Sequence, residues 1–325
     1  MAYTWIQQVD MTKPDKFLEA SWLEEAVKLY QETGNKAMVG KIMKRIREAN
    51  RESLARGEYG AIPVPYEIPV EELEKIHSQY LEHANLFDSL RSIAQSDELI
   101  PSTNNALLRA KQSLSQSSLL NLMNQGIMRG DRKAAELKTP EKKEEFKTSQ
   151  NLSLSSSWII FWVVSPVLEK LRSEKGLNAE NILEFFRAWG QLNEPILALM
   201  ATGFERYFTN DYVSALYVLM PTLERIIREL LMQFEVNVSP PKDGGYRESM
   251  LGSMLDKPEA EEIFGTTIKE YLKFVLINEE TGGMNLRNDV GHALLDKEDC
   301  TQQTADLLIF LYLVMTRFTP KNTTE

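Results

Sequence analysis

The sequence predicts an all-α fold, and three observations support this prediction. Apolar residues recur along most of the chain with the 3.6-residue period of helices, and the alternation typical of strands is nearly absent. A hydrophobic content of 43% over 325 residues is sufficient for a sizeable core. We therefore expect N-terminal helical hairpins at 1–60, a middle helical region with a connector at 61–150, and a C-terminal helical bundle at 151–325.

The first predicted helix begins at the letters TKPD and ends near TGN. Thr12 is its expected N-cap, Asp15 follows three residues later as in a capping box, and Pro14 is tolerated in the first turn. Gly34 is expected to be left-handed after the helix. The segment FLEASWLEEAVKLYQETGN is similar to helical-hairpin repeats that bind proteins, although one unit is too short for a solenoid. This similarity suggests a protein partner at the N-terminal helices.

The second predicted helix, 36–56, has the most basic surface of the chain. Its apolar side chains share one face, and the opposite face carries four cations: Lys36, Lys44, Arg47 and Arg51. Two interpretations remain open. The cations form a solvated helix face, or they follow the phosphates of an RNA ligand. These four residues are therefore candidates for substrate binding.

Two connectors are expected between the helical regions. The letters AIPVPYEIPV contain three prolines within seven positions, which is typical of an extended connector. A long helix at 70–94 follows, on which His77 and His83 are expected to be surface residues. The segment from 102 to 150 is polar, and its end, KTPEKKEEFKTSQ, has mixed charge without an apolar face. This end predicts a mobile connection and a domain boundary near residue 150.

Apolar density rises after residue 150, where six segments have helical periodicity with short breaks. Such segments predict a compact helical bundle. Their large aromatic side chains are expected in its core, because core packing is the commonest role of such residues. They include Trp158, Trp162, Phe185, Trp189 and Phe208.

Charge and composition argue against several classes of protein. The formal charge of −10 argues against broad, non-specific binding of nucleic acids, although it leaves room for a local basic groove. The single cysteine, Cys300, forms no internal disulfide, and with three histidines we expect neither a metal site nor a cofactor. The N-terminus lacks an export signal, and no uninterrupted apolar run approaches the roughly 20 residues that cross a bilayer. We therefore expect a cytoplasmic protein that does not span a membrane.

The segment GGMNLRNDVGHALL, residues 282–295, contains a histidine five residues after an arginine. Asn285 is the expected N-cap of a helix that begins at Leu286. At about 100° per residue, an apolar face contains Leu286, Val290, Ala293 and Leu294. The other face contains Arg287, Asn288, Gly291 and His292. A glycine on this face leaves space for another backbone or a nucleotide.

The polar face suits the cleavage of RNA without a metal. Arg287 and the free N–H groups at the helix start can bind a phosphate, and His292 can move a proton near neutral pH. Asn288, one turn earlier, can hold the imidazole by a hydrogen bond. The ribose 2′-hydroxyl would attack the adjacent phosphate while Arg287 stabilises the developing charge. A structural alternative remains open, in which Arg287 pairs with a carboxylate such as Glu224 and His292 packs at the edge of the bundle.

The letters NLRNDVGH resemble the R-x4-6-H signature of the HEPN superfamily, which has an all-helical nucleotide-binding fold. The chain is more closely similar to a domain family of unknown function that carries RNxxxHG near its C-terminal end. The segment ATGFERYFTNDYVSALYVLMPTLERIIRELL resembles the upstream segment of that family, here with Pro221, Glu224 and Arg228. The resemblance covers roughly residues 150 to 315.

The resemblance implies a metal-independent endoribonuclease, usually a homodimer in which two Arg/His pairs meet at the interface. It makes Arg287 and His292 the catalytic pair and Asn288 the residue that orients them. Ala293 stands where the family has a glycine, and some members of the superfamily have lost catalysis. We therefore expect an RNA-cleaving enzyme of the toxin or antiviral-defence type. The alternative is a non-catalytic scaffold for dimerisation and protein interaction.

Overall fold

The computed structural model describes residues 1–58, 68–116, 125–129, 131–242 and 244–320. Its regular structure is almost entirely helical, which confirms the predicted all-α class. The chain divides into two compact units, which are described separately. Unit 1 comprises 1–67 and 123–138, and unit 2 comprises 68–122 and 139–325. Most of the predicted proline-rich connector, 59–67, lies outside the described residues.

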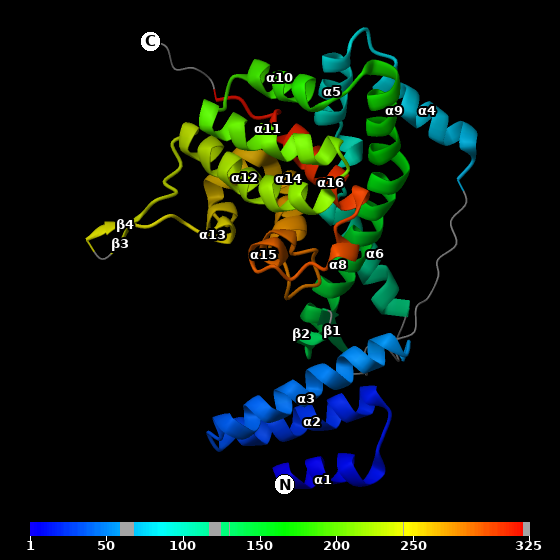
Figure 1. The fold of residues 1–325 in the computed structure, drawn as a ribbon, viewed down its shortest axis with the longest axis vertical. Helices are drawn as coiled ribbons and strands as arrows, with labels where there is room; N and C mark the ends of the chain where they lie inside the picture. Colours follow the sequence, from blue (N-terminus) through cyan, green and yellow to red (C-terminus); the bar gives the residue numbers. More distant parts are fainter. Residues whose placement is uncertain (59–67, 117–124, 130, 243, 321–325) are drawn as a thin grey trace. The chain divides into compact units, whose positions relative to one another are not determined.

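The described residues of unit 1 form three helices and one antiparallel β-hairpin: α1 (Ala2–Thr12), α2 (Lys16–Glu32), α3 (Lys36–Ala55), β1 (Gln125–Arg129) and β2 (Arg132–Leu137). Helix α2 packs against both α1 and α3, so the three helices lie in sequence order (Figure 1). Their small core consists of Val9, Ala20, Leu23, Ala26, Val27, Ile42, Ile46 and Ala49. The hairpin is tied to α3, because the amide of Asn50 donates to the carbonyl of Asp131 at 3.1 Å.

The start of α2 differs from the expectation. Asp15 is the N-cap, and its side chain accepts a hydrogen bond from the N–H of Leu18 at 2.8 Å. Thr12 instead ends α1, where its hydroxyl donates to the carbonyl of Gln8. The left-handed Gly34 is confirmed with φ of 70°, and the second predicted helix is confirmed as α3.

Unit 2 is a helical bundle. Its α-helices are α4 (Val70–Leu81), α5 (Leu86–Gln95), α6 (Thr103–Gln116), α8 (Pro140–Ile159), α9 (Ser165–Lys175), α10 (Ala179–Trp189), α11 (Glu194–Phe208), α12 (Tyr212–Gln233), α13 (Leu251–Leu255), α14 (Pro258–Leu276), α15 (Leu286–Gly291) and α16 (Gln302–Met315). A short hairpin, β3 (Pro241–Lys242) and β4 (Gly245–Tyr246), extends from the bundle between α12 and α13 (Figure 1). Two 3-10 turns, Asp97–Leu99 and Lys297–Asp299, complete the unit.

The predicted long helix at 70–94 is two helices. Asn85 starts α5, because its side chain accepts the N–H of Asp88 at 2.9 Å and makes it an N-cap. The polar segment before residue 150 also differs from the expectation of a mobile connector. Thr139 caps α8, Pro140 occupies its first turn, and the helix continues across residue 150. The compact units therefore do not divide at residue 150.

Helices α8 and α9 form one continuous helix, joined by a π-helical turn at Ile160–Val164. Within it, Pro166 has no N–H to donate to the carbonyl of Trp162, four residues earlier. Nε2 of His77 donates to that carbonyl instead, at 2.8 Å. The prediction that His77 is a surface residue is therefore wrong: its exposed fraction is 8%.

The same continuous helix, Pro140–Lys175, is long and apolar enough to cross a membrane by length and composition alone. The uninterrupted apolar run in it is short, as expected, but a window of 18 residues within it is apolar enough, with few charges, to be a candidate span. Inside the structure, 44% of that window is buried. Core helices of soluble proteins pass the same test, so this property is weak evidence for a membrane span.

Helix α16 lies at the centre of unit 2. All eleven residues from Ala305 to Met315 are buried, and they pack against α5, α9, α12 and the π-helical turn. The expected core aromatics are present around it: Phe185 is buried, and Trp158, Trp162, Trp189 and Phe208 are partly buried against the core. The hydroxyl of Tyr312 donates to the carbonyl of Leu219 at 2.6 Å, which satisfies a polar group inside the core.

Helices α11 and α12 approach closely at Gly203. A Cβ at this position would lie 2.5 Å from Cγ of Leu219 and closer still to Cδ2. Leu219 is itself 1% exposed, so its side chain has little room to move. The glycine is thus required by the packing of these two helices.

Gly203→Ala is expected to destabilise unit 2 by about 1–3 kcal/mol, because the added methyl overpacks the interface. Gly40→Ala in α3 is the control, since a Cβ there meets no atom within 4 Å and alanine favours a helix. Hydrogen exchange followed by mass spectrometry should show reduced protection of α11 and α12 in the first variant and unchanged or increased protection of α3 in the second. Unchanged protection of α11 would contradict the close approach.

One carboxyl group lies inside this core. Asp306 has no exposed surface, and the hydroxyl of Tyr207 donates to its Oδ1 at 2.5 Å. Burial raises the pKa of Asp306 above its ordinary value, although the hydrogen bond from Tyr207 opposes the shift. The folded chain therefore binds this proton more tightly than the unfolded chain does.

The stability that Asp306 contributes is present below about pH 4, the pKa range of an unfolded Asp, and is lost as the pH rises through the folded pKa. An asparagine side chain cannot ionise, so Asp306→Asn should not show this loss. The free energy of unfolding of the variant should therefore rise relative to that of the natural chain as the pH rises, by at most about 1.4 kcal/mol per pH unit. Urea unfolding between pH 4 and 8 measures the difference. Glu184→Gln, which changes an exposed carboxylate in the same way, should give a flat difference.

Candidate functional site

Helix α15 contains the Arg-Asn pair of the predicted site, and a tight turn determines where it begins. The N–H of Met284 donates to the carbonyl of Phe274 at 2.8 Å, which returns the chain to the end of α14. A Cβ at Gly283 would lie 2.5 Å from the carbonyl oxygen of Asn278, so only glycine fits this turn. As predicted, the helix then begins at Leu286 and places Arg287 in its first turn.

The anchoring of α15 is partly apolar and partly polar. Leu286 and Val290 are buried against the bundle, as expected. Asn285 is the N-cap residue, but it is left-handed, with φ of 57°, and its side chain makes no capping bond. Instead its amide donates to Oδ1 of Asp289 at 3.2 Å, and its oxygen accepts from the amide of Asn288 at 2.7 Å. Polar side chains therefore hold the start of the helix in place of a cap.

Arg287 is held by two side chains. Its Nε donates to Oε2 of Glu224 at 2.6 Å, its Nη2 lies 3.4 Å from Oε1 of Glu224, and its Nη1 donates to Oδ1 of Asn288 at 3.0 Å. This is the pairing that the structural alternative predicts. A guanidinium has five N–H groups, so two remain for a ligand after these bonds to described residues. The Arg287 side chain is 27% exposed, which leaves it within reach of solvent.

Glu224 also contacts a second cation. Nη2 of Arg228 lies 3.3 Å from Oε1 of Glu224, one turn along α12, and Nη1 of Arg228 binds Glu248 at 2.8 Å. The same Nη1 donates to the carbonyl of Ser249 at 3.0 Å. Residue spacing on α12 explains the first contact, but the pairing with Glu248 has no local signal in the sequence, because Glu248 lies 20 positions further along the chain and a hairpin intervenes.

His292 lies at the C-terminal end of α15 and is exposed. Its ring makes no hydrogen bond to any residue that the structure describes. The predicted bond from Asn288 to His292 is wrong, because the Asn288 side chain bonds Arg287 and Asn285 instead. Asn288 thus orients the arginine and leaves the imidazole free to exchange a proton with solvent or a ligand.

The polar face of α15 is open, as predicted for Gly291, where a Cβ would meet no atom within 4 Å. The predicted apolar face is shorter than expected. The helix ends at Gly291, so Ala293 and Leu294 do not continue its buried side, and both are exposed. These exposed residues lie next to His292 on an open surface, not in a cavity.

Ala293 has a left-handed backbone, with φ of 53°. Its N–H donates to the carbonyl of Val290 at 3.1 Å, and the N–H of Leu294 donates to the carbonyl of Asp289 at 2.7 Å. This pair of bonds is a Schellman motif, in which the left-handed residue is usually glycine. The backbone therefore favours glycine at position 293, independent of any close approach by RNA.

The surroundings of the site are acidic. Residues 277–300 contain six Asp and Glu against two Lys and Arg. Glu224 further balances the charge of Arg287. Because phosphate binding depends on local positive charge, this segment alone offers little attraction to RNA.

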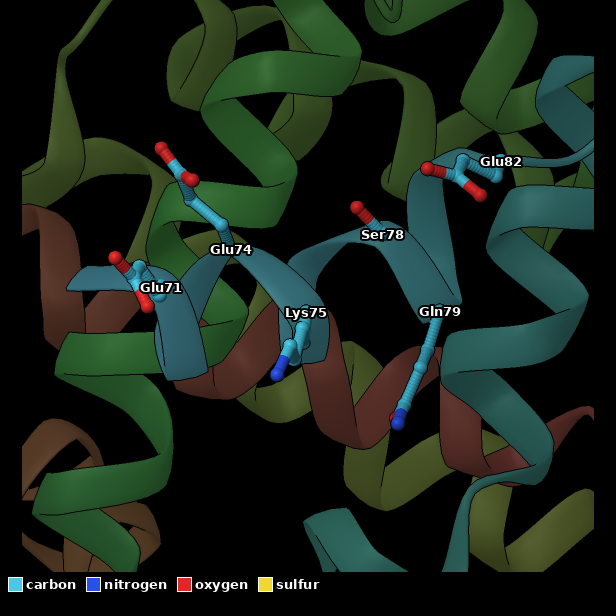
Figure 2. A pocket seen from close by; sticks show the side chains of 6 residues that line it. All are labelled: Glu71, Glu74, Lys75, Ser78, Gln79 and Glu82. Atoms are coloured by element: carbon cyan, nitrogen blue, oxygen red, sulfur yellow. The ribbon is translucent and has the colours of Figure 1, made fainter. Parts of the chain in front are cut away.

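A separate hollow of about 750 Å³ lies beside α4, far along the chain from Arg287 and His292. Figure 2 shows six lining side chains along this helix, with Lys75 and Gln79 diverging from Glu74 and Glu82. All of them come from α4 and its C-cap residue Glu82, so the hollow is a surface feature. In the described part of the chain, no three His, Cys, Asp or Glu side chains form a group that could hold a metal ion.

The four candidate substrate-binding cations belong to unit 1. Lys36, Lys44, Arg47 and Arg51 are all exposed on α3, as the helical spacing predicts. Arg51 is bound to Asp131 of the β1–β2 hairpin at 2.6 Å. The structure therefore brings together Arg287 and Asn288 with Glu224 in unit 2, and the four basic residues lie on one helix of unit 1.

Ala293→Gly is expected to stabilise unit 2 by about 0.5–1 kcal/mol. Replacing alanine relieves a left-handed strain of roughly 1–2 kcal/mol. Glycine loses more conformational entropy on folding than alanine does, which reduces this gain by roughly 0.4–1 kcal/mol. Ala198→Gly, at an exposed position inside α11, is the control and should destabilise by about 1 kcal/mol. Chemical denaturation measures both, and a loss of stability in Ala293→Gly would contradict the assigned conformation.

Comparison of the chain with protein-family models, curated proteins and solved structures finds no match. The resemblance to HEPN proteins therefore rests on the residues of the motif. Any function for the site has to be argued from Arg287, Asn288, His292 and their surroundings.

Proposed function

We propose that the chain is a metal-independent endoribonuclease. The observation that carries the proposal is the geometry of Arg287, which is fixed by Glu224 and Asn288 with two N–H groups left, on the short helix whose C-cap is the exposed His292. A fixed cationic donor and a free imidazole are the two groups that cleavage of an RNA phosphodiester requires. The resemblance to ribonucleases with the same Arg/His spacing supports this assignment.

In the proposed reaction, the ribose 2′-hydroxyl attacks the adjacent phosphorus. The hydroxyl loses its proton, the bond from phosphorus to the 5′-oxygen breaks, and that oxygen takes up a proton. His292 transfers one of these protons, and Arg287 stabilises the charge on the phosphoryl oxygens. In the homodimer that the resemblance implies, His292 of the partner subunit supplies the other proton transfer. The dimer is part of the proposal, and the molecular mass in solution measures it.

Glu224 has two opposing effects in this proposal. It prevents the guanidinium of Arg287 from rotating, which reduces the entropy cost of placing a donor at the phosphate. It also neutralises much of the positive charge that a phosphate would meet. Arg287 would therefore act mainly as an oriented hydrogen-bond donor.

A second function is favoured by one observation. The acidic surroundings of Arg287 and its pairing with Glu224 suit a structural role, in which unit 2 is a non-catalytic module for dimerisation and protein interaction. The two functions differ in a measurable way. An RNA-cleaving toxin or defence protein would slow cell growth on expression unless Arg287 or His292 is replaced, and a scaffold would not.

The proposed chemistry predicts the products and the effect of each residue. RNA fragments should end in 2′,3′-cyclic phosphate and 5′-hydroxyl, EDTA should not stop the reaction, and DNA should survive because it lacks the nucleophile. Arg287→Ala should reduce cleavage about a hundredfold or more, and His292→Ala at least as much. Asn288→Ala should have a smaller effect, since it positions Arg287 and does not react.

The controls are an arginine and a histidine outside the site. His83 lies on the segment after α4, where its Nε2 is 3.0 Å from the carbonyl of Gln79, and Arg91 pairs with Asp88 on α5. His83→Ala and Arg91→Ala should leave cleavage unchanged. Products with 5′-phosphate ends, or a requirement for added magnesium, would show that this mechanism is wrong. Purified protein that never cuts RNA would favour the scaffold.

A further inference from the structure

We propose that one face of helix α3 binds the phosphate backbone of RNA. This face, called the α3 face below, consists of Lys36, Gly40, Lys44, Arg47 and Arg51. Spacings of three and four residues place them on one side of the helix, over about 22 Å at 1.5 Å per residue. The choice of RNA as the ligand rests on the proposed function, whereas the surface itself is described by the structure.

The cations of the α3 face are available to a ligand. Lys36 and Arg47 are exposed and make no ion pair with any described residue. Lys44 lies 3.8 Å from Glu48, and both side chains are largely exposed, at 81% and 57%. Such exposed pairs contribute at most about 1 kcal/mol, so a phosphate can replace Glu48 with little loss. Arg51 is held in place by Asp131, which balances much of its charge, so Lys36, Lys44 and Arg47 carry most of the attraction.

Gly40 lies between the first two cations of the α3 face, one turn from Lys36 and one turn from Lys44. Glycine inside a helix costs roughly 0.5–1 kcal/mol relative to alanine. Packing does not require it, because a Cβ at Gly40 would meet no atom within 4 Å. A ligand whose backbone comes close to the helix between the cations explains both the missing side chain and its position.

Charge is distributed unevenly between the two units. Unit 1 contains 14 Lys and Arg against 12 Asp and Glu, and unit 2 contains 23 against 35. The net charge of unit 2 repels phosphates, and the acidic segment around Arg287 does so locally. A ribonuclease site in unit 2 therefore needs affinity for RNA from elsewhere in the chain. The α3 face has the charge to provide it.

A protein partner fits the α3 face less well than RNA does. Protein interfaces take most of their binding energy from buried aromatic and apolar anchors, and they are depleted in lysine. The five residues of the α3 face include no aromatic side chain, and the exposed apolar residues on the same side of the helix, Met43 and Leu54, are separated by the cations. A narrow row of cations along a straight helix instead matches a ligand whose charges repeat along a backbone.

The test uses full-length protein carrying His292→Ala, so that the probe is not consumed. Fluorescent RNA of about 16 nucleotides, single-stranded or duplex, is titrated at several salt concentrations. The double variant Lys44→Glu/Arg47→Glu should bind at least about tenfold more weakly at low salt. With single-stranded RNA, the slope of the logarithm of the association constant against the logarithm of the salt concentration should be less steep for the double variant by about 1.4, which is about 0.7 for each lost phosphate contact.

The matched control is Lys75→Glu/Lys142→Glu, which changes the net charge equally at two exposed positions of unit 2. Its affinity should stay within about twofold of the parent, as expected for charges outside the binding surface. Equal losses in the two double variants, or no loss in the α3 variant, would overturn the proposal. Absence of binding to both probes would also overturn it and would indicate a protein ligand.

Gly40→Gln tests the close approach. It should weaken RNA binding severalfold without lowering the melting temperature. Unchanged affinity would show that the RNA backbone does not pass close to Gly40 and would overturn this part of the proposal.

Failure of this inference differs from failure of the proposed function. RNA that is bound through the α3 face but never cut by the natural chain overturns only the ribonuclease. RNA that is cut normally by Lys44→Glu/Arg47→Glu at concentrations below the dissociation constant overturns only the role of the α3 face.

Discussion

The burial of α16 on every side is the constraint on which unit 2 depends. A helix that is apolar around its whole circumference has to be surrounded by other elements, and α5, α9, α12 and the π-helical turn provide that surface. The hydrogen bond from Tyr312 to Leu219 ties α16 to α12, and α12 in turn carries Glu224. The position of the partner of Arg287 is therefore determined by the packing of a core that contains no residue of the candidate site.

A continuous set of polar contacts links separate parts of unit 2. It runs from Glu248, beside the β3–β4 hairpin, through Arg228 and Glu224 of α12 to Arg287 of α15. From Arg287 it continues within α15 and its N-cap through Asn288 to Asn285. Every member is restrained before any ligand binds, so the cost of ordering the arginine is met during folding. The imidazole of His292 is outside this set, and it is the one group of the motif that is free to reorient.

Local sequence patterns are sufficient to predict the features that depend on residues nearby in the sequence. The all-α class, helix α3, the left-handed Gly34 and the start of α15 follow from periodicity and end signals. The pairing of Arg287 with Glu224 could be stated in advance only as one alternative, because 63 residues separate the partners and periodicity carries no information on such contacts. The burial of His77 also depends on a distant residue, since its partner is the carbonyl of Trp162, to which Pro166 cannot donate. Ala293 was expected on the apolar face of α15 but lies beyond the end of the helix. An apolar residue that fits the helical period gives no sign that the helix has already ended.

The π-helical turn between α8 and α9 has a consequence for how this chain can change over evolutionary time. Such a turn contains one residue more than the α-helical turn it replaces, and one residue corresponds to about 100° around the helix axis. Loss of a single residue at 160–164 would preserve both helices and yet rotate Val167, Leu168 and Leu171 of α9 out of the core. Substitutions at 160–164 are limited by the size and polarity that the core accepts. Insertions and deletions are limited more strictly, because only the present number of residues keeps both helices in register with the core. Descendants of this chain should therefore change the amino acids of this segment far more readily than its length.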